Sequence, residues 1–392
     1  MVARGLRATA YGLQSVLLGL YLDAAGLPPE TTGLLLTATL AGSAGLTVVL
    51  GARADRWGRR RSLLAGSLLT AAGAGLFAFG DSPWLWTAAA LSGTIFAGAG
   101  EAGPLETVES AALPQLVSAD KRNRFFGWTS ALGAAGVAAG ALAAGAAPFA
   151  PTEMLGYRLG FAASGALVLL SAVPLLRLSP GSEATTLGVA VGGLQRSRRV
   201  VFRLSALFAL DSLAGGFVVQ SFVVYWFHQR FGVGAEVLGP TFFGVNVMKA
   251  VSYPTAARLA DRFGLLPTMV FSHLPSNFLL LLLPLAPTLG AAIAILVLRH
   301  ALAQMDVPTR TSYLVGIVDP EERTAALSLT SSVRMTAHAL SPSLAGFAWQ
   351  AAGAAAPFWL GGGLKIVYDL GLWLGFRRIH PHEEQVIGKA EQ

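Results

Sequence analysis

A short basic loop decides how this chain folds: residues 51–61 read GARADRWGRRR. Apolar stretches at 31–52 and 62–80 flank the loop. A helix that crosses a bilayer needs about 20 mainly apolar residues, so each flank is long enough to span. Arginines collect in the cytoplasmic loops of membrane proteins, so we expect this loop to join two helices on the cytoplasmic side.

The composition extends this interpretation to the whole chain. Of 392 residues, 54% are hydrophobic and 12% are charged, whereas a soluble domain has about 25% charged residues. A chain this apolar cannot cover its surface with polar groups, which excludes a water-soluble enzyme and a disordered chain. The absence of cysteine excludes disulfides, thiolate metal sites and a cysteine nucleophile. The net charge of +7 comes from basic clusters between apolar stretches, which favours cytoplasmic loops over a nucleic-acid partner.

About twelve apolar stretches are long enough to form membrane-spanning helices. They are too long for barrel strands and lack the alternation that such strands show. The first has no small-residue cleavage site, so we expect a span there and not a signal peptide. The expected spans are 6–24, 31–52, 62–80, 84–103 with an extension to 117, 125–147, 156–177, 203–228, 236–257, 265–287, 289–317, 325–350 and 356–376.

The chain also repeats itself with one spacing of 206 positions, seen in Gln14-Ser15 and Gln220-Ser221, Gly26 and Gly232, Gly33 and Gly239, and Asp55-Arg56 and Asp261-Arg262. Alternate loops are basic, which places the start of both copies in the cytoplasm and predicts a parallel repeat of six helices each. We expect an N-terminal bundle at 1–178, a cytoplasmic linker at 179–200, a C-terminal bundle at 201–378 and a cytoplasmic tail at 379–392.

The basic loop matches the pattern G-x-x-x-D-R-x-G-R-R at every defined position, and a degenerate copy, ARLADRFG, stands at 257–264. In this loop, in its length and in its repeat the chain resembles the major facilitator superfamily. The resemblance implies an all-α membrane fold of two pseudo-symmetric six-helix bundles, which transports solutes by alternating access. It also implies a cytoplasmic latch between the bundles, made by Gly51, Asp55, Arg56, Gly58, Arg59, Arg60, Asp261 and Arg262.

Two departures weaken assignment to the drug-exporting branch of that family. Many drug–proton antiporters carry a Gly-Pro signature in the fifth helix, where this chain has Gly133, Gly136 and Gly140 but no proline. Many members also carry an arginine in the fourth helix, which is absent here. The small residues of the fifth span predict close helix packing instead.

Carboxylates inside spans are costly, so each one marks a candidate functional site. Glu101 stands within Gly100–Pro104, where glycine and proline predict a helix break. Asp211 lies inside the seventh span and Asp306 inside the tenth. A buried carboxylate can load and release a proton, so these three residues are the expected proton-coupling candidates.

Other polar side chains inside the spans are candidates to line a substrate cavity, which in the resembled family lies among helices 1, 4, 7 and 10. The candidates are Gln14, Gln220, Asn246, Lys249, Gln304, Arg310, Arg334 and His338. Structural pairing is the alternative. Asp306 with Arg310 and Lys365 with Asp369 are i, i+4 pairs that could each neutralise within one helix.

These features predict a secondary active transporter that moves a small polar or charged solute with H⁺ as the driving ion. The alternatives are a facilitative uniporter and a proton-driven multidrug exporter of the same fold. A non-transporting receptor or scaffold and a membrane-embedded enzyme have less support from the sequence.

We found no G-x-x-x-x-G-K-[ST] or H-E-x-x-H motif, and we expect no enzyme activity, cofactor or metal site. The expected partners are a small-molecule substrate, H⁺ and the lipid bilayer. The expected protein is a monomer in the inner or plasma membrane with both termini cytoplasmic.

Cysteine labelling tests the predicted topology, because the native chain has no cysteine. Single cysteines at Arg59, Arg198 and Arg378 should react only from the cytoplasm. Cysteines at Asp81 and Glu153 should react only from outside, because basic loops stay in the cytoplasm. Labelling of positions 198 and 378 from opposite sides would contradict the parallel repeat of six plus six helices.

Overall fold

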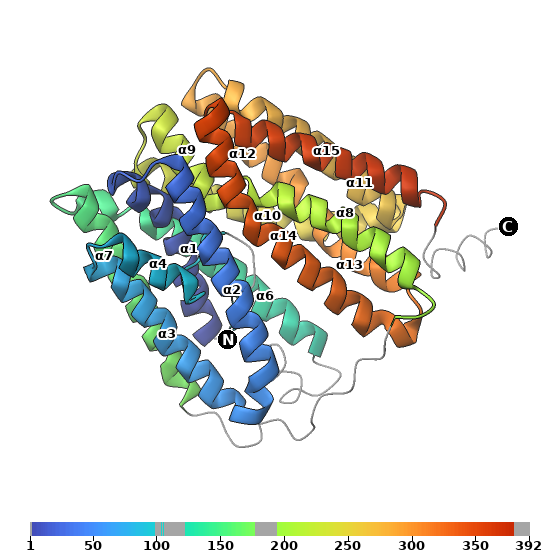
Figure 1. Ribbon diagram of the computed structural model, residues 1–392, viewed down its shortest axis with the longest axis horizontal. Helices are drawn as coiled ribbons and strands as arrows, with labels where there is room; N and C mark the ends of the chain where they lie inside the picture. The colour runs from blue at the N-terminus through green and yellow to red at the C-terminus, as the bar shows by residue number, and fades with distance from the viewer. Residues whose placement is uncertain (1, 99–102, 104, 106–121, 177–193, 380–392) are drawn as a thin grey trace. The chain divides into compact units, whose positions relative to one another are not determined.

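The computed structural model describes residues 2–98, 103, 105, 122–176 and 194–379 (Figure 1). Within these ranges the chain is helical and contains no strand, which confirms the expected all-α class. Glu101 and most residues of the expected linker and tail lie outside the described residues.

Most of the described helices fall on the expected spans. The first half of the chain contains α1 Val2–Ala24, α2 Pro29–Trp57, α3 Arg59–Phe79, α4 Pro83–Leu91, α6 Arg122–Ala144, the short turn η3 Ala147–Phe149 and α7 Glu153–Leu175. The second half contains α8 Arg198–Gly216, α9 Gln220–Phe231, α10 Ala235–Phe263, α11 Leu265–Leu282, η5 Leu283–Leu285, α12 Leu289–Ala303, α13 Asp306–Ile317, η6 Pro320–Glu322, α14 Arg323–Ala352 and α15 Ala356–Phe376. Seven segments of the described chain are long and apolar enough to cross a membrane.

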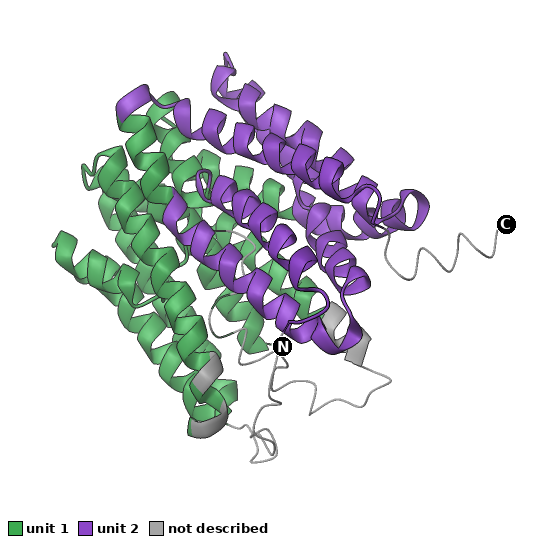
Figure 2. Cartoon of the chain, turned by 45° about the vertical axis from the view of Figure 1, so that its right-hand side comes forward, with its two compact units in different colours: residues 1–188, 219–247, 342–350 green, residues 189–218, 248–341, 351–392 purple. Residues whose placement is uncertain are grey.

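The chain divides into two compact units (Figure 2). Unit 1 comprises residues 1–188, 219–247 and 342–350, and unit 2 comprises residues 189–218, 248–341 and 351–392. Unit 1 therefore holds the first sequence repeat together with α9 and parts of α10 and α14. The expected bundle limits at 178 and 201 stay a prediction.

The helix boundaries repeat with the same offset of 206 positions as the sequence. α2 and α10 have 29 residues each, and α3 and α11 begin at Arg59 and Leu265. Gly58 precedes α3 with a φ of 92°, and Gly264 precedes α11 with a φ of 89°. A positive φ is open to glycine and strained for other residues, so the signature loop and its degenerate copy make similar turns.

Two expected spans are interrupted by short non-helical segments. The seventh span ends as α8 at Gly216 and resumes as α9 at Gln220. The tenth span breaks at Gln304, between α12 and α13. Pro308 explains the second break, because it has no N–H to donate to the Gln304 carbonyl. That carbonyl accepts a long hydrogen bond of 3.4 Å from the Val307 N–H instead.

The expected extent of the fourth span is wrong. α4 ends at Leu91, and the described residues that follow, up to 98, are not helical. Gly93 has a φ of 73°, and a Cβ atom there would lie 2.2 Å from the Gly42 carbonyl oxygen of α2. This close backbone approach ends the helix well before the break expected at Gly100–Pro104.

The apolar core of unit 2 lies among α8, α11, α13 and α15. Phe208, Met269, Tyr313 and Tyr368, one from each of these helices, are buried in a single cluster. Helices in a bilayer associate largely by van der Waals packing of this kind. The cluster therefore holds the four helices at the spacing at which their polar side chains meet.

One carboxylate anchors the end of the expected linker. Glu322 in η6 accepts hydrogen bonds of 2.6 to 2.8 Å from the backbone N–H groups of Gln195, Arg196 and Ser197. These donors, Ser197 foremost, lower the pKa of Glu322 to about 2. The resulting stabilisation is fully present above the ordinary glutamate pKa and is lost as the pH falls through about 2.

Small residues bring α1 and α6 into close contact in unit 1. A Cβ atom at Gly140 of α6 would lie 1.9 Å from the Thr9 carbonyl oxygen. One at Gly136 would lie 2.7 Å from the Gly5 carbonyl oxygen. This geometry confirms the close packing that the small residues of the fifth span predicted.

Gly140→Ala should destabilise the protein by about 1–3 kcal/mol, because the added methyl group has no room beside Thr9. Gly75→Ala in α3 is the matched control, since no atom lies within 4 Å of its added Cβ. Alanine forms helix better than glycine, so the control should be neutral or slightly stabilising. Thermal unfolding of detergent-purified protein measures both, and equal melting temperatures for the two variants would contradict the packing.

Candidate functional site

Asp211 of α8 is the centre of a buried charged network in unit 2. Its Oδ2 accepts a hydrogen bond of 3.0 Å from Arg310 Nη1 of α13. Its Oδ1 accepts one of 2.6 Å from Lys365 Nζ of α15. All three side chains are at most 8% exposed. One carboxylate therefore holds two cations from two other helices.

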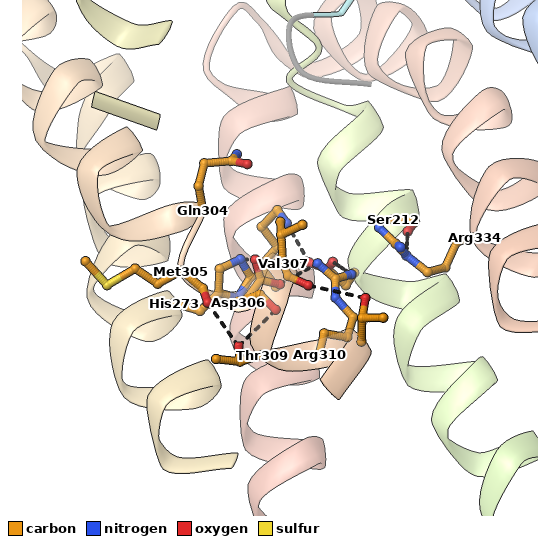
Figure 3. Close-up of polar contacts among 12 residues, drawn as sticks. Ser212, His273, Gln304, Met305, Asp306, Val307, Thr309, Arg310 and Arg334 are labelled. Atoms are coloured by element: carbon orange, nitrogen blue, oxygen red, sulfur yellow. Dashed lines mark hydrogen bonds and ion pairs between the residues drawn. The ribbon is translucent and has the colours of Figure 1, made fainter. Parts of the chain in front are cut away.

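Arg310 joins two carboxylates. Its Nη2 donates to Asp306 Oδ2 at 2.6 Å, one turn earlier in α13 (Figure 3), while its Nη1 donates to Asp211. The guanidinium also lies over the Phe208 ring, 5.6 Å from the ring centroid, as a cation–π contact. The predicted pairing of Asp306 with Arg310 is confirmed, and Asp211 is a second partner that helical spacing could not predict.

α11 adds His273 and Asn277 to the network. His273 Nδ1 lies 2.8 Å from Asp369 Oδ1, and Asn277 Nδ2 donates to Asp369 Oδ2 at 2.8 Å. The other ring nitrogen, Nε2, lies 3.9 Å from Asp211 Oδ1. The imidazole is thus within hydrogen-bond distance of Asp369 and lies near Asp211, but beyond hydrogen-bond distance of it.

The expected pairing of Lys365 with Asp369 within α15 is wrong. Lys365 bonds to Asp211, whereas Asp369 bonds to His273 and Asn277. The i, i+4 spacing puts both side chains on one face, but neighbouring helices offer each of them another partner. Our sequence reasoning missed His273 and Asn277. Two polar side chains four residues apart in an apolar span are the signal that could have found them.

α14 places Arg334 and His338 beside α8. Arg334 Nε donates to Ser212 Oγ at 3.0 Å (Figure 3). His338 Nδ1 lies 3.0 Å from the Ser212 carbonyl oxygen. A carbonyl oxygen only accepts, so this nitrogen of His338 is the donor. Both cavity candidates therefore contact the residue that follows Asp211.

Arg299 and His300 lie near the end of α12. Arg299 Nη1 lies 3.3 Å from His300 Nε2, and His300 Nδ1 lies 2.8 Å from the Leu296 carbonyl oxygen. A guanidinium only donates and a carbonyl only accepts, so Nε2 accepts and Nδ1 donates. His300 is therefore the neutral Nδ1–H tautomer. Arg299 is 8% exposed, and its Nε has no hydrogen-bond partner within the described part of the chain.

The remaining candidates of the second half make other contacts. Gln304 lies at the break between α12 and α13, apart from Arg310 (Figure 3), and its Oε1 accepts a bond of 3.4 Å from the Tyr253 hydroxyl. Lys249 of α10 is buried. Asn246 donates to a carbonyl of its own helix at 2.8 Å. The structure thus separates Gln304 from the charged network that contains Arg310.

The glutamine candidates of unit 1 bond to neutral groups. Gln14 Nε2 donates to Ser164 Oγ at 3.0 Å, and its Oε1 accepts a bond of 3.0 Å from the Phe96 N–H in the non-helical segment after α4. Gln220 Nε2 donates to Ser15 Oγ at 2.8 Å. These residues are repeat-related in sequence, and both join α1 to other parts of unit 1.

The structure describes the side chains of only some residues of the expected latch. Arg59 is 6% exposed at the start of α3. Asp261 and Arg262 are exposed near the end of α10, with the Arg262 guanidinium over the Phe263 ring. The latch role of these residues stays a prediction. The local surroundings of Gly51, Asp55 and Arg56 lie outside the described side chains.

The buried charged network around Asp211 suits electrostatic switching and proton transfer. It brings titratable carboxylates, an imidazole and basic side chains into hydrogen-bond reach in a mainly apolar interior, where each interaction is stronger than in water. Among the described residues, no group of three histidine, aspartate or glutamate side chains is placed to hold a metal ion. Glu101, the third proton-coupling candidate, lies outside the described residues.

Sequence comparisons identify proteins that are similar to this chain. A sequence model described as Major Facilitator Superfamily matches residues 1–248 and 213–392. The uncharacterized membrane protein YJR124C of Saccharomyces cerevisiae is 26% identical over 380 residues, which cover 87% of this chain and 85% of the yeast protein. Multidrug resistance protein MdtH of Yersinia enterocolitica is 33% identical over 126 residues, which cover 31% of this chain and 29% of MdtH.

Solved structures share the fold at low sequence identity. The nucleoside transporter NupG matches with a TM-score of 0.75 at 14% identity, over 96% of this chain and 97% of NupG. A D-xylose–proton symporter matches with a TM-score of 0.72 at 15% identity, over 95% of this chain and 96% of the symporter. These likenesses confirm the expected fold of two pseudo-symmetric helical bundles.

Lys365→Met should destabilise the protein by about 3–5 kcal/mol, because it removes one partner of a buried ion pair and leaves Asp211 and Asp306 to share the single charge of Arg310. Adding Asp211→Asn to that variant should recover part of the loss, since one charge of each sign is then absent. Thermal unfolding of the two single variants and the double variant measures the coupling. Losses that add without recovery would contradict the pair.

Proposed function

We propose that this chain, which belongs to the major facilitator superfamily, carries a small polar or charged solute across a membrane by alternating access, with H⁺ as the coupling ion. Members of this family are membrane transporters and not enzymes, and the chain has their multi-pass helical fold. Proteins of the same fold include one named a nucleoside transporter and one named a D-xylose–proton symporter, which supports a solute-carrying role.

One observation carries the proposal: Asp211 is buried between Arg310 and Lys365. Taking charges out of water is costly, so a structural role alone would be served as well by apolar side chains of similar size. A carboxylate that binds a proton loses its hold on both cations. Proton binding at Asp211 would therefore change how α8 is held against α13 and α15.

Lys365 has a second carboxylate within reach along its own helix. Its Nζ bonds to Asp211 in the structure, while Asp369 follows four residues later on the same face of α15. When Asp211 is protonated, Lys365 is released to turn toward Asp369. His273 then loses its place beside Asp369 and is left to interact with other groups. H⁺ would thus favour one of two pairings, which is how a ligand shifts a conformational equilibrium.

A proton-driven multidrug exporter is the second candidate function. The segment that resembles MdtH favours it, although it covers less than a third of either chain. The fifth helix, which has no proline, counts against it. In a facilitative uniporter, by contrast, Asp211 and Asp306 would serve only as structural partners of Arg310.

The proposed location is the inner or plasma membrane, with the protein acting as a monomer and both termini in the cytoplasm. The alternation of basic and non-basic loops supports this orientation. The Glu322 contact with residues 195–197 would then lie at the cytoplasmic end of unit 2, where it fixes the start of α8 after the linker.

Asp211→Asn should abolish solute accumulation driven by a pH gradient and leave exchange between equal pools intact. The amide keeps the size of the side chain but cannot titrate. Proteoliposomes with an imposed gradient test this, with uridine, D-xylose, succinate and ethidium as probes. Glu101→Gln and Asp306→Asn test the other two coupling candidates. Asp81→Asn alters an exposed carboxylate outside this network and should accumulate solute as the wild type does.

The outcomes of this experiment test separately whether transport is coupled to H⁺ and whether Asp211 is the residue that binds it. If wild-type uptake of every transported probe ignores the gradient, H⁺ coupling is wrong and the uniporter takes its place. If Asp211→Asn responds to the gradient as the wild type does, coupling stands and Asp211 is not its carrier. Persistence of equal-pool exchange shows that a variant has folded.

A further inference from the structure

Basic side chains outnumber acidic ones inside the described spans of unit 2. The buried acidic side chains there are Asp211, Asp306 and Asp369. Apart from Lys249, the buried basic side chains are Arg299, Arg310 and Lys365, and the partly buried Arg334 adds another. Charge in an apolar bundle is costly without an opposite charge. The described interior of this unit therefore favours the entry of an anion over that of a cation.

Arg334 is a cation with unused binding capacity beside the Asp211 network. Its Nε donates to the neutral hydroxyl of Ser212 at 3.0 Å. No carboxylate oxygen of the described residues lies within 4.0 Å of its guanidinium nitrogens. A guanidinium has five N–H donors in a planar fork that matches a carboxylate or a phosphate. The donors of its two terminal nitrogens are therefore open to an anionic group.

Gly215 leaves space beside Lys365 and His338. It lies one turn after Asp211 on α8, close to Ser212, which Arg334 contacts. A Cβ atom at Gly215 would lie 3.8 Å from Lys365 Nζ and 3.9 Å from His338 Nδ1. The missing side chain thus leaves a small gap between an ammonium and an imidazole, on the face of α8 that meets α14 and α15.

We propose that Arg334, which contacts Ser212, and Lys365, which lies beside Gly215, bind an anionic oxyacid group, a carboxylate or a phosphate, on the transported solute. This inference rests on the proposed transport function and names its substrate class. Arg334 supplies the bidentate contact, and Lys365 supplies a point charge.

The same geometry links the anion to the proton. Lys365 is held by Asp211 in the structure, and Arg310 and His273 also face that carboxylate. A proton on Asp211 frees the Lys365 ammonium, which turns to the anion when one is bound and toward Asp369 when the site is empty. One proton and one negative charge enter the site together, so the interior gains no net charge from a monoanion. Solute and proton would therefore favour the same state of the carrier.

Binding to the purified full chain in detergent tests the site. The probes are sodium succinate, sodium phosphate, D-xylose and tetraphenylphosphonium chloride, each at matched ionic strength. Thermal stabilisation should occur with succinate or phosphate, and which of the two acts distinguishes a carboxylate from a phosphate ligand. Arg334→Gln should weaken that binding by about 10- to 100-fold, because a charge-assisted bidentate contact is lost.

Two further variants separate binding from folding. Arg334→Lys keeps the charge without the fork and should bind with intermediate affinity. Arg258→Gln removes an exposed arginine of α10 in the same unit and should bind as the wild type does. The inference is overturned if Arg334→Gln binds the anion as tightly as the wild type. It is also overturned if D-xylose or tetraphenylphosphonium binds while neither anion does. Gradient-driven accumulation of either of those two probes would keep the transporter and remove the anion site alone.

Discussion

A charged group inside an apolar helical bundle is costly unless an opposite charge lies against it, and this constraint organises the interior of unit 2. Asp211 satisfies it by holding Arg310 and Lys365 from two other helices. Because Lys365 is engaged there, Asp369 pairs with His273 instead. Each of α8, α11, α13 and α15 contributes a member, so the four helices are joined by charge as well as by their apolar core.

Backbone breaks inside the expected spans follow the same constraint. An unwound backbone in an apolar setting must find partners for its N–H and C=O groups. In unit 1 the Phe96 N–H after α4 donates to Gln14 Oε1. In unit 2 the Gln304 carbonyl accepts from the Val307 N–H, because Pro308 has no N–H to offer. Breaks of this kind occur in transporters at points where helices bind solutes or change shape.

The two halves of the chain repeat in backbone and differ in chemistry. Gly58 and Gly264 begin equivalent helices with the same sign of φ. The glutamines at Gln14 and Gln220, also repeat-related, bond to neutral hydroxyl groups in unit 1. Among the described residues, the charged network around Asp211 is made only of side chains from the second half of the chain. A pseudo-symmetric fold can thus provide the two-bundle architecture while, among the described residues, a charged network forms in one half.

The sequence by itself determined the membrane class, most of the spans and the repeat, because these depend on local length, hydrophobicity and spacing. It also marked Asp211 and Arg310 as candidates, since charges inside spans are rare. Only the tertiary structure decided how the charges pair. Helical spacing pointed Lys365 to Asp369, yet Lys365 bonds to Asp211, 154 residues away in the chain. The pairing depends on which helix faces which, and that is set by side-chain packing between segments far apart in sequence.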